Sequence, residues 1–263
     1  MSVGRHVVVG GVRVATASRD ELVRNIIGDC LARRADRSEA SPRLLFDSNG
    51  HAISLAARDP DYRQALDEAD LIHADGGFVV IASRWLAGAR VVERSATTDL
   101  IHDLGREAEK KGVSFYLLGG TEAVNRRCAE RLTELYPRLI LKGRRHGFFG
   151  EADEARVLSD IAEAKPDILW IGLGKPKEQI FVARNRSRIK ATWVITCGGC
   201  FNYIAGAYSR APQWMQRASL EWLYRAFTDP KLFWRYAITS PHAIWLALVR
   251  ADRWRSSDSR SDA

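Results

Sequence analysis

The sequence lacks any long uninterrupted apolar segment. No run at the N-terminus resembles a signal peptide, and the apolar stretch 232–249 is broken by Arg235, Pro241 and His242. A helix that crosses a bilayer needs about 20 predominantly apolar residues. We therefore expect a protein that stays in the cytosol, peripheral on the inner face of the cell membrane at most.

Cysteine is also scarce, with four residues in 263. Cys197 and Cys200 form a CxxC pair, but a zinc site needs about four ligands, and Cys30 and Cys128 lie far away without a partner pair. A redox pair of the thioredoxin type should open a helix after a strand, whereas Phe-Asn-Tyr follows here. We interpret both residues as small side chains where a strand end meets a turn.

Two common nucleotide-binding motifs are missing as well, since the chain contains neither a GxGxxG fingerprint with its downstream acidic residue nor a GxxxxGK[ST] loop. This weakens one alternative, a nucleotide-dependent oxidoreductase. A second alternative, a basic nucleic-acid-binding protein, would interleave aromatic residues with basic strands. Here the basic and aromatic residues gather at the C-terminus instead.

Positive charge and tryptophan are what the chain has in excess. Its net charge is +8, which implies an anionic partner. Residues 210–236 combine Trp214, Trp222 and Trp234 with regularly placed arginines. Trp is stable at the boundary between hydrocarbon and water, and Arg can pair with phosphate, so this segment predicts a membrane surface, with an ordinary amphipathic core helix as the alternative.

Strand-like and helical segments alternate along the rest of the chain. Short strands are expected on either side of Gly10-Gly11 and at 44–46, 69–74, 113–118, 168–171 and 193–196, with a helix at 19–34 and another from about His51. This order predicts an α/β fold, a doubly wound, mainly parallel, Rossmann-like sheet. We divide the chain into a catalytic domain at 1–209, a helical membrane-associating appendage at 210–250 and a disordered tail at 251–263.

Asp59-Pro60-Asp61 resembles the metal-binding acidic pair of many sugar transferases. Asp59, however, stands where an N-cap belongs and Pro60 at the first helical position, so capping explains the pair better. We assign no metal and no cofactor.

Three features could carry chemistry. Asp75, at a strand end before two glycines, could act as a general base or simply form an Asp-Gly turn. Arg94 could neutralise a diphosphate, or pair on the surface with Glu93 or Asp99. The turn at 172–177, with Pro176 as the first helical residue and Lys175 and Lys177 adding charge, could hold a phosphate, or could be a plain strand-helix connection.

Eight blocks in order along residues 5–240 resemble the WecG/TagA/CpsF glycosyltransferases. They read N at 49, ADGG at 74–77, ER at 93–94, LLGG at 117–120, HGFF at 146–149, GLGKPKEQ at 172–179, GGCFNYIAG at 198–206 and RAPQWMQRASLEWLYR at 210–225. The resemblance implies transfer of a sugar from a UDP-sugar to a polyprenyl-diphosphate-linked acceptor at the membrane, with inversion and without a metal. The donor could be UDP-N-acetylmannosamine, its uronic acid or UDP-glucose. The sequence does not decide whether the protein forms a homo-oligomer.

The same resemblance assigns the site residues. Asp75 takes the place of the base, Arg94 that of the arginine on the leaving diphosphate, and Asn49 that of an active-site asparagine. Donor-binding positions are Gly119, Gly120, His146, Phe148, Gly172, Gly174, Lys177, Glu178, Gln179 and Asn202. Arginines expected to face lipid phosphate or the acceptor diphosphate are Arg210, Arg217, Arg225 and Arg235.

The chain departs from the family pattern at several of these blocks. The family usually has Thr where Asp47 stands, DGMG where the chain has Asp75-Gly-Gly-Phe, and PKQE where it has PKEQ. Where the family usually has Phe-Asp, this chain has Phe-Asn with Asn202, and where the family has His-Gly-Tyr, it has His-Gly-Phe with Phe148. These last three departures surround the expected nucleotide pocket, so donor identity stays open.

Overall fold

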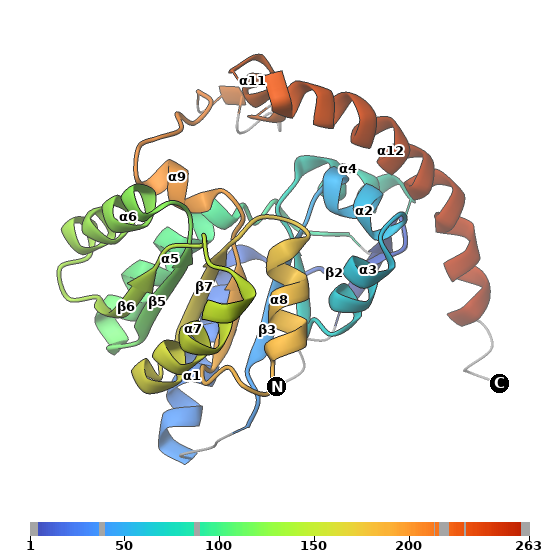
Figure 1. Ribbon diagram of the computed structural model, residues 1–263. Helices are drawn as coiled ribbons and strands as arrows, with labels where there is room; N and C mark the ends of the chain where they lie inside the picture. The colour runs from blue at the N-terminus through green and yellow to red at the C-terminus, as the bar shows by residue number, and fades with distance from the viewer. Residues whose placement is uncertain are drawn as a thin grey trace.

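The computed structural model describes residues 5–36, 40–86, 90–212, 214–215, 221–228 and 230–258 (Figure 1). Its centre is a six-stranded sheet in which every neighbouring pair is parallel. In spatial order the strands are β4 (Leu71–Ala74), β3 (Arg43–Ser48), β8 (Trp193–Thr196), β7 (Ile168–Gly172), β5 (Ser114–Gly119) and β6 (Ile140–Arg145). The predicted parallel α/β fold is confirmed.

Helices cover both faces of this sheet, because successive strand residues point to opposite sides. Leu44 and Phe46 belong to one buried cluster, whereas Leu45 between them belongs to the other. The first cluster is covered by α2 (Gly50–Ala56), α3 (Pro60–Asp67), α4 (Gly77–Leu86), α7 (Glu151–Ala164) and α8 (Lys177–Asn185). The second is covered by α1 (Arg19–Asp36), α5 (Thr97–Lys111), α6 (Glu122–Leu135) and α9 (Cys200–Ile204).

A separate antiparallel hairpin, β1 (His6–Val9) and β2 (Val12–Ala15), precedes the sheet. Gly10 and Gly11 form its turn with φ of 59° and 87°, a left-handed conformation that suits a two-residue hairpin loop. This hairpin confirms the prediction of two short strands around the glycine pair.

The edge strand β6 was not predicted. Its sequence, Ile-Leu-Lys-Gly-Arg-Arg, has no buried position and therefore none of the apolar run that marks the other strands. A strand at a sheet edge has one side free for solvent, so polar residues are tolerated there.

The connections diverge between β5 and β7, which is where ligands bind in open α/β sheets. The chain leaves β5 towards the edge strand β6, and it leaves β7 towards β8 on the other side. The backbones meet closely here, since a Cβ at Gly119 would lie 2.3 Å from the carbonyl oxygen of Gly172. Only glycine permits this approach, which brings two of the predicted donor-binding loops into contact.

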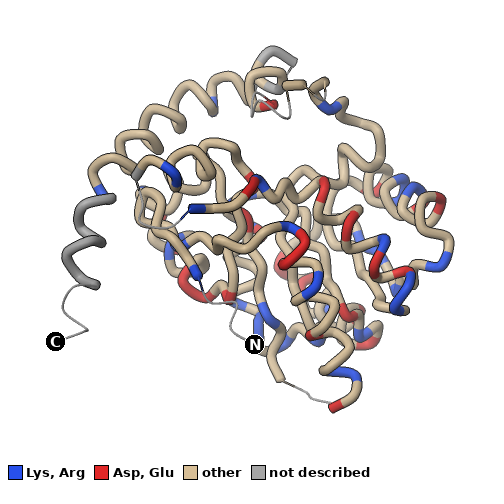
Figure 2. The backbone as a smooth tube through the Cα atoms, turned by 180° about the vertical axis from the view of Figure 1, so that it is seen from behind, with Lys and Arg blue, Asp and Glu red and all other residues tan. Residues whose placement is uncertain are grey.

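The C-terminal segment forms α11 (Glu221–Thr228) and α12 (Pro230–Asp258), an arch across the top of the molecule (Figures 1 and 2). Ala243, Leu246 and Ala247 on the inner face of α12 are buried in the first cluster. This face of α12 therefore packs as an ordinary core helix does. The backbone of α12 continues to Asp258, into the segment expected to be a disordered tail, and residues 259–263 lie outside the described part of the chain.

Candidate active site

Asp75 lies directly after β4, at the carboxyl edge of the sheet. Its N–H donates to the carbonyl oxygen of Ser48 at 3.0 Å, which ties the β4 end to the β3 end. Its carboxylate Oδ1 accepts from the Thr97 N–H at 2.9 Å and from the Thr97 hydroxyl at 3.2 Å. The start of α5 therefore fixes the orientation of the Asp75 carboxylate.

The charges around Asp75 keep it ionised. Burial by itself raises the pKa of Asp75, but the nearby charges, Arg94 first among them, lower it to about 2. A carboxylate at this position is therefore deprotonated throughout the physiological range.

Arg94 contacts Asp75 through the backbone rather than through the carboxylate. Its Nε donates to the Asp75 carbonyl oxygen at 2.7 Å, and its Nη2 lies 2.8 Å from the Glu221 carboxylate of α11. The alternative of a surface pair with Glu93 or Asp99 is wrong, because Glu93 binds the Arg19 N–H and Asp99 pairs with other arginines.

Asn49 caps the helix that begins after β3. Its Oδ1 accepts from the Ala52 N–H at 3.0 Å. A Cβ at Gly76 would lie 2.8 Å from the Asn49 Cβ, so a glycine beside Asp75 lets the two loops touch. The structure thus brings the loops of Asn49, Asp75 and Arg94 together.

A buried histidine that was not predicted from the sequence, His73, lies next to the residues that bind Asp75. His73 Nδ1 lies 3.0 Å from the Ser95 hydroxyl, and its Nε2 lies 3.5 Å from the Thr97 hydroxyl that binds Asp75. Burial lowers the pKa of His73. The sequence does mark this residue, because it is a histidine inside the otherwise apolar strand Leu-Ile-His-Ala.

Two N–H groups of the glycine turn after β7, those of Leu173 and Gly174, are bound within the protein. Glu178 Oε2 accepts from the N–H groups of Leu173, Gly174 and Gly198 at 3.0–3.1 Å. The buried Glu178 carboxyl group therefore occupies the position expected for a bound phosphate, and it joins the loops after β7 and β8. The plain strand-helix connection describes this turn better.

The two lysines of this turn also differ from expectation. Lys175 has only 9% of its side chain exposed and forms an ion pair with Asp47 at the end of β3. Lys177 is exposed, with its Nζ 5.4 Å from the Phe149 ring centre. Pro176 precedes the helix as its N-cap, so α8 begins at Lys177 and not at the proline.

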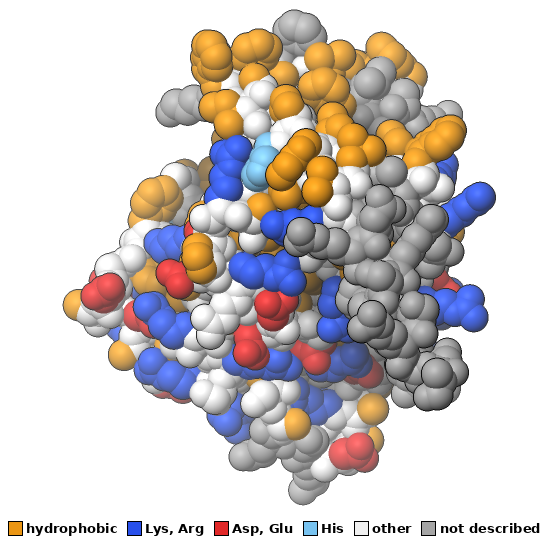
Figure 3. Space-filling view, turned by 90° about the vertical axis from the view of Figure 1, so that its right-hand side faces the viewer, with side chains coloured by type: hydrophobic (Ala, Val, Ile, Leu, Met, Phe, Trp, Pro, Cys, Tyr) orange, Lys and Arg blue, Asp and Glu red, His pale blue; other side chains and the backbone are white. Residues whose placement is uncertain are grey.

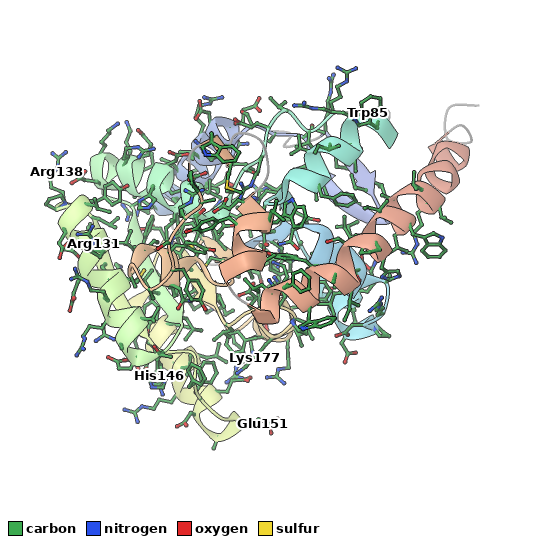
Figure 4. All side chains as sticks on the ribbon, turned by 90° about the horizontal axis from the view of Figure 1, so that it is seen from above. Trp85, Arg131, Arg138, His146, Glu151 and Lys177 are labelled. Carbon is green, nitrogen blue, oxygen red and sulfur yellow. The ribbon has the colours of Figure 1, made fainter. Side chains whose placement is uncertain are left out.

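Several of the remaining predicted donor-binding positions lie at the carboxyl ends of β5 and β6. Gly120 donates its N–H to the Gly172 carbonyl at 3.1 Å, and His146 Nδ1 accepts from the Phe148 N–H at 3.2 Å. His146 and Lys177 lie on the same side of the molecule (Figure 4), and the Phe148 ring is 73% exposed.

Two further donor-binding positions are polar side chains with internal partners. Gln179 is buried, and its Nε2 donates to Glu178 Oε1 at 3.1 Å and to the Thr196 hydroxyl at 3.3 Å. Asn202, on α9, donates to the Gly199 carbonyl at 3.5 Å.

The arginines expected to face lipid are placed differently from one another. Arg210 pairs with Asp99 and lies 3.4 Å from Glu221, so its charge is compensated inside the protein. Arg235 is half-buried on α12, with its guanidinium 5.4 Å from the Tyr236 ring centre. Arg217 and the side chain of Arg225 lie outside the described residues.

Neither the cysteines nor the acidic pair forms a metal or redox centre. All four cysteines are free and buried, and burial raises the pKa of Cys197 and Cys200 well above its usual range, so neither is a reactive thiolate. Cys200 does open the short helix α9, contrary to the expectation that no helix follows the pair. Asp59 accepts from the Tyr62 N–H at 3.0 Å, which confirms its capping role. In the described ranges, no cluster of three or more His, Cys, Asp or Glu side chains could hold a metal ion.

Comparison with known proteins bears on the activity. The chain is 33% identical, over 199 residues, to an N-acetylglucosaminyldiphosphoundecaprenol N-acetyl-beta-D-mannosaminyltransferase of Bacillus subtilis (strain 168). This match covers 76% of this chain and 72% of the relative. Proteins of the same name from Bacillus spizizenii and Staphylococcus aureus (strain NCTC 8325 / PS 47) are 30% and 29% identical. These matches cover 80% and 72% of this chain, and 77% and 73% of the relatives.

A family model matches nearly the whole chain, including the C-terminal helices. The match spans residues 7–258, from the first hairpin to the end of α12. This confirms the resemblance drawn from the eight blocks, and it decides against the oxidoreductase and nucleic-acid-binding alternatives. The chain belongs to the glycosyl transferase WecG/TagA/CpsF family and is a glycosyltransferase.

Proposed function

We propose that this enzyme transfers a sugar from a UDP-sugar to a polyprenyl-diphosphate-linked saccharide and inverts the anomeric centre. The observation that carries the proposal is Asp75, an ionised carboxylate at a strand end with Arg94 bound to its backbone. The named relatives act on a sugar diphosphate attached to undecaprenol. That chemistry needs a base for the acceptor hydroxyl and a cation for the leaving diphosphate.

Asp75 is the base in this proposal. Thr97 holds Oδ1, and no described hydrogen bond engages Oδ2, which can accept the proton of the acceptor hydroxyl as that oxygen attacks the anomeric carbon. A carboxylate with a pKa of about 2 is a weak base. The negative diphosphate of a bound donor would offset the charge of Arg94 and so raise the basicity of Asp75.

Arg94 stabilises the departing UDP. A guanidinium has five N–H donors; here the Nε–H binds the Asp75 carbonyl oxygen, and Nη2 forms an ion pair with Glu221. The others can bind phosphate oxygens, which arginine does in a bidentate manner. With Asn49 beside the site, this cation supplies charge stabilisation of the kind a metal provides elsewhere, so the transfer is proposed to need no metal.

The lipid part of the acceptor places the enzyme against a membrane surface. No helix within the described residues is long and apolar enough to cross a membrane. Large hydrophobic side chains gather at the end formed by α4, α11 and α12, and charged side chains dominate below (Figure 3). On the outer face of α12, Trp234, Ile238, Trp245 and Leu248 are each more than half exposed. This face suits the boundary between headgroups and acyl chains.

The donor remains one of three sugars. Phe148, Asn202 and the Glu178-Gln179 pair stand where the family pattern differs, and Glu178 is bound within the protein. UDP-N-acetylmannosamine, its uronic acid and UDP-glucose are therefore all compatible with the site.

Thermal unfolding with ligands tests the proposal. A ligand at about 100 times its Kd stabilises the folded state by about 2.7 kcal/mol. UDP should raise the Tm, whereas NAD and a short oligonucleotide should leave it unchanged. A Tm raised by NAD or the oligonucleotide, and not by UDP, would contradict the proposed donor class.

A further inference from the structure

Glu221 reaches from the first residue of α11 back to the catalytic domain. Its Oε2 lies 2.8 Å from Arg94 Nη2, and only 8% of its side chain is exposed. Arg94 also donates through Nε to the Asp75 carbonyl oxygen at 2.7 Å. The guanidinium is therefore held between the loop that carries Asp75 and a helix more than 100 residues further along the chain.

A second arginine fixes the Glu221 carboxylate in turn. Arg210 Nε lies 3.4 Å from Glu221 Oε1, and the Nη1 of Arg210 pairs with Asp99 near the start of α5. The carboxylate thus lies between two guanidinium groups, each with a further contact on the catalytic domain. This arrangement orients α11 by charge at a buried position, where ion pairs are sensitive to the loss of one partner.

The two contacts of Arg94 determine where its remaining N–H groups point. The hydrogen bond at Nε holds one edge of the guanidinium, and the ion pair between Nη2 and the Glu221 carboxylate holds a second edge. A fixed cation stabilises a developing charge without reorganising during the reaction. The carboxylate of this ion pair belongs to the C-terminal segment and not to the α/β domain.

We infer that Glu221 is a positioning residue that acts through Arg94, so that turnover depends on α11 being seated against the catalytic domain. The inference rests on the proposed role of Arg94 at the leaving diphosphate. An enzyme whose α11 is displaced would bind its donor with a misplaced arginine and react slowly.

The first experiment is Glu221→Gln in the full-length enzyme, with kcat and the donor KM measured on a lipid-linked acceptor. The amide keeps the shape and removes the charge. We expect kcat to fall about 10- to 100-fold with less than a threefold change in KM, because the lost interaction serves the transition state. The control is Glu134→Gln on α6, an exposed glutamate that also pairs with two arginines, Arg127 and Arg131; its kinetics should match the wild type.

A double-mutant cycle with Arg94→Ala separates positioning from general stability. If Glu221 acts through Arg94, Glu221→Gln should lower kcat by less than about twofold in the Arg94→Ala background. An equal fall in both backgrounds, or no fall in the wild-type background, would overturn the inference. An Arg94→Ala enzyme with wild-type kcat would instead contradict the role proposed for Arg94, and the inference with it.

Glu221→Asp keeps the test decisive if the glutamine variant does not fold. Aspartate retains the charge and withdraws it by one methylene, so kcat should fall several-fold at an unchanged Tm, and only while Arg94 is present. A folded aspartate variant with wild-type kcat, or with the same loss in the Arg94→Ala background, would overturn the inference.

Discussion

The Lys175 ammonium and the Asp47 carboxylate form an ion pair in the interior, where 9% and 5% of their side chains are exposed. Burial alone lowers the pKa of Lys175, but Asp47 reverses this and the net pKa is raised, so the lysine stays charged. Asp47 stands where the family pattern has Thr. The structure explains this departure, since the added negative charge at β3 is compensated by a lysine from the loop before α8.

Removing one member of this pair should be costlier than removing both. Lys175→Met leaves an unpaired buried carboxylate and should lower the free energy of unfolding by about 3–5 kcal/mol. Adding Asp47→Thr should restore part of that loss. Urea unfolding of the two single variants and the double variant measures the difference, and losses that simply add would show that the two charges do not interact.

Glu178 should make stability depend on pH. Burial raises its pKa to about 7, although Lys175 and the bound N–H groups act in the opposite direction. In the unfolded chain the value is near 4.5, so the folded state holds a proton that the unfolded state releases. This contribution to stability is complete below pH 4.5 and is lost as the pH rises to about 7.

Urea unfolding of the wild type and Glu178→Gln between pH 4.5 and 8 isolates this effect. The difference between the two proteins should change by about 1–3 kcal/mol up to pH 7 and then level off. A difference that is the same at every pH would show that Glu178 is ionised throughout.

Sequence patterns predicted the local features of this protein well. Alternating apolar segments identified five of the six sheet strands, and the Asp59-Pro60 signal identified a helix start, because both depend on neighbouring residues. The strand β6 was not predicted, because a strand at the edge of a sheet needs no apolar run. Asp75, Arg94 and Asn49 were placed by resemblance to the family.

What could not be predicted depends on contacts between distant residues. The turn after β7 has the glycines and lysines of a phosphate site, yet Glu178 binds two of its N–H groups and Asp47 pairs with Lys175. Glu221 gave no signal of its contact with Arg94, since 127 positions separate them and only the folded chain brings them together. Local composition describes which groups are present, and the tertiary structure decides which of them are already paired.

The outer face of α12 should bind lipid. Trp234→Ser combined with Trp245→Ser should weaken sedimentation with phosphatidylglycerol vesicles at least about 10-fold, because burying a large apolar side chain contributes about 1.5–3 kcal/mol. Leu135→Ser on α6 is the control, since Leu135 is also exposed, at 48%, but lies away from this face. If the double variant and the control sedimented like the wild type, α12 would not be a lipid contact.

Transfer should continue without a divalent metal. Arg94 and Asn49 are proposed to serve the diphosphate, and the acidic residue Asp59 is already engaged as a helix cap. Initial rates with and without EDTA should agree within about twofold, which corresponds to less than about 0.5 kcal/mol in the barrier. A rate abolished by EDTA and restored by Mg²⁺ or Mn²⁺ would contradict the metal-independent mechanism.

The most direct test of the account is the rate at which purified Asp75→Asn transfers sugar from the UDP-donor to a polyprenyl-diphosphate-linked N-acetylglucosamine. Asparagine preserves the bonds from Thr97 to Oδ1 but cannot accept the proton, so kcat should fall by about 10²–10⁴. UDP should still raise the Tm of the variant as it does that of the wild type. A folded, UDP-binding Asp75→Asn enzyme with near-normal turnover would show that Asp75 is not the base.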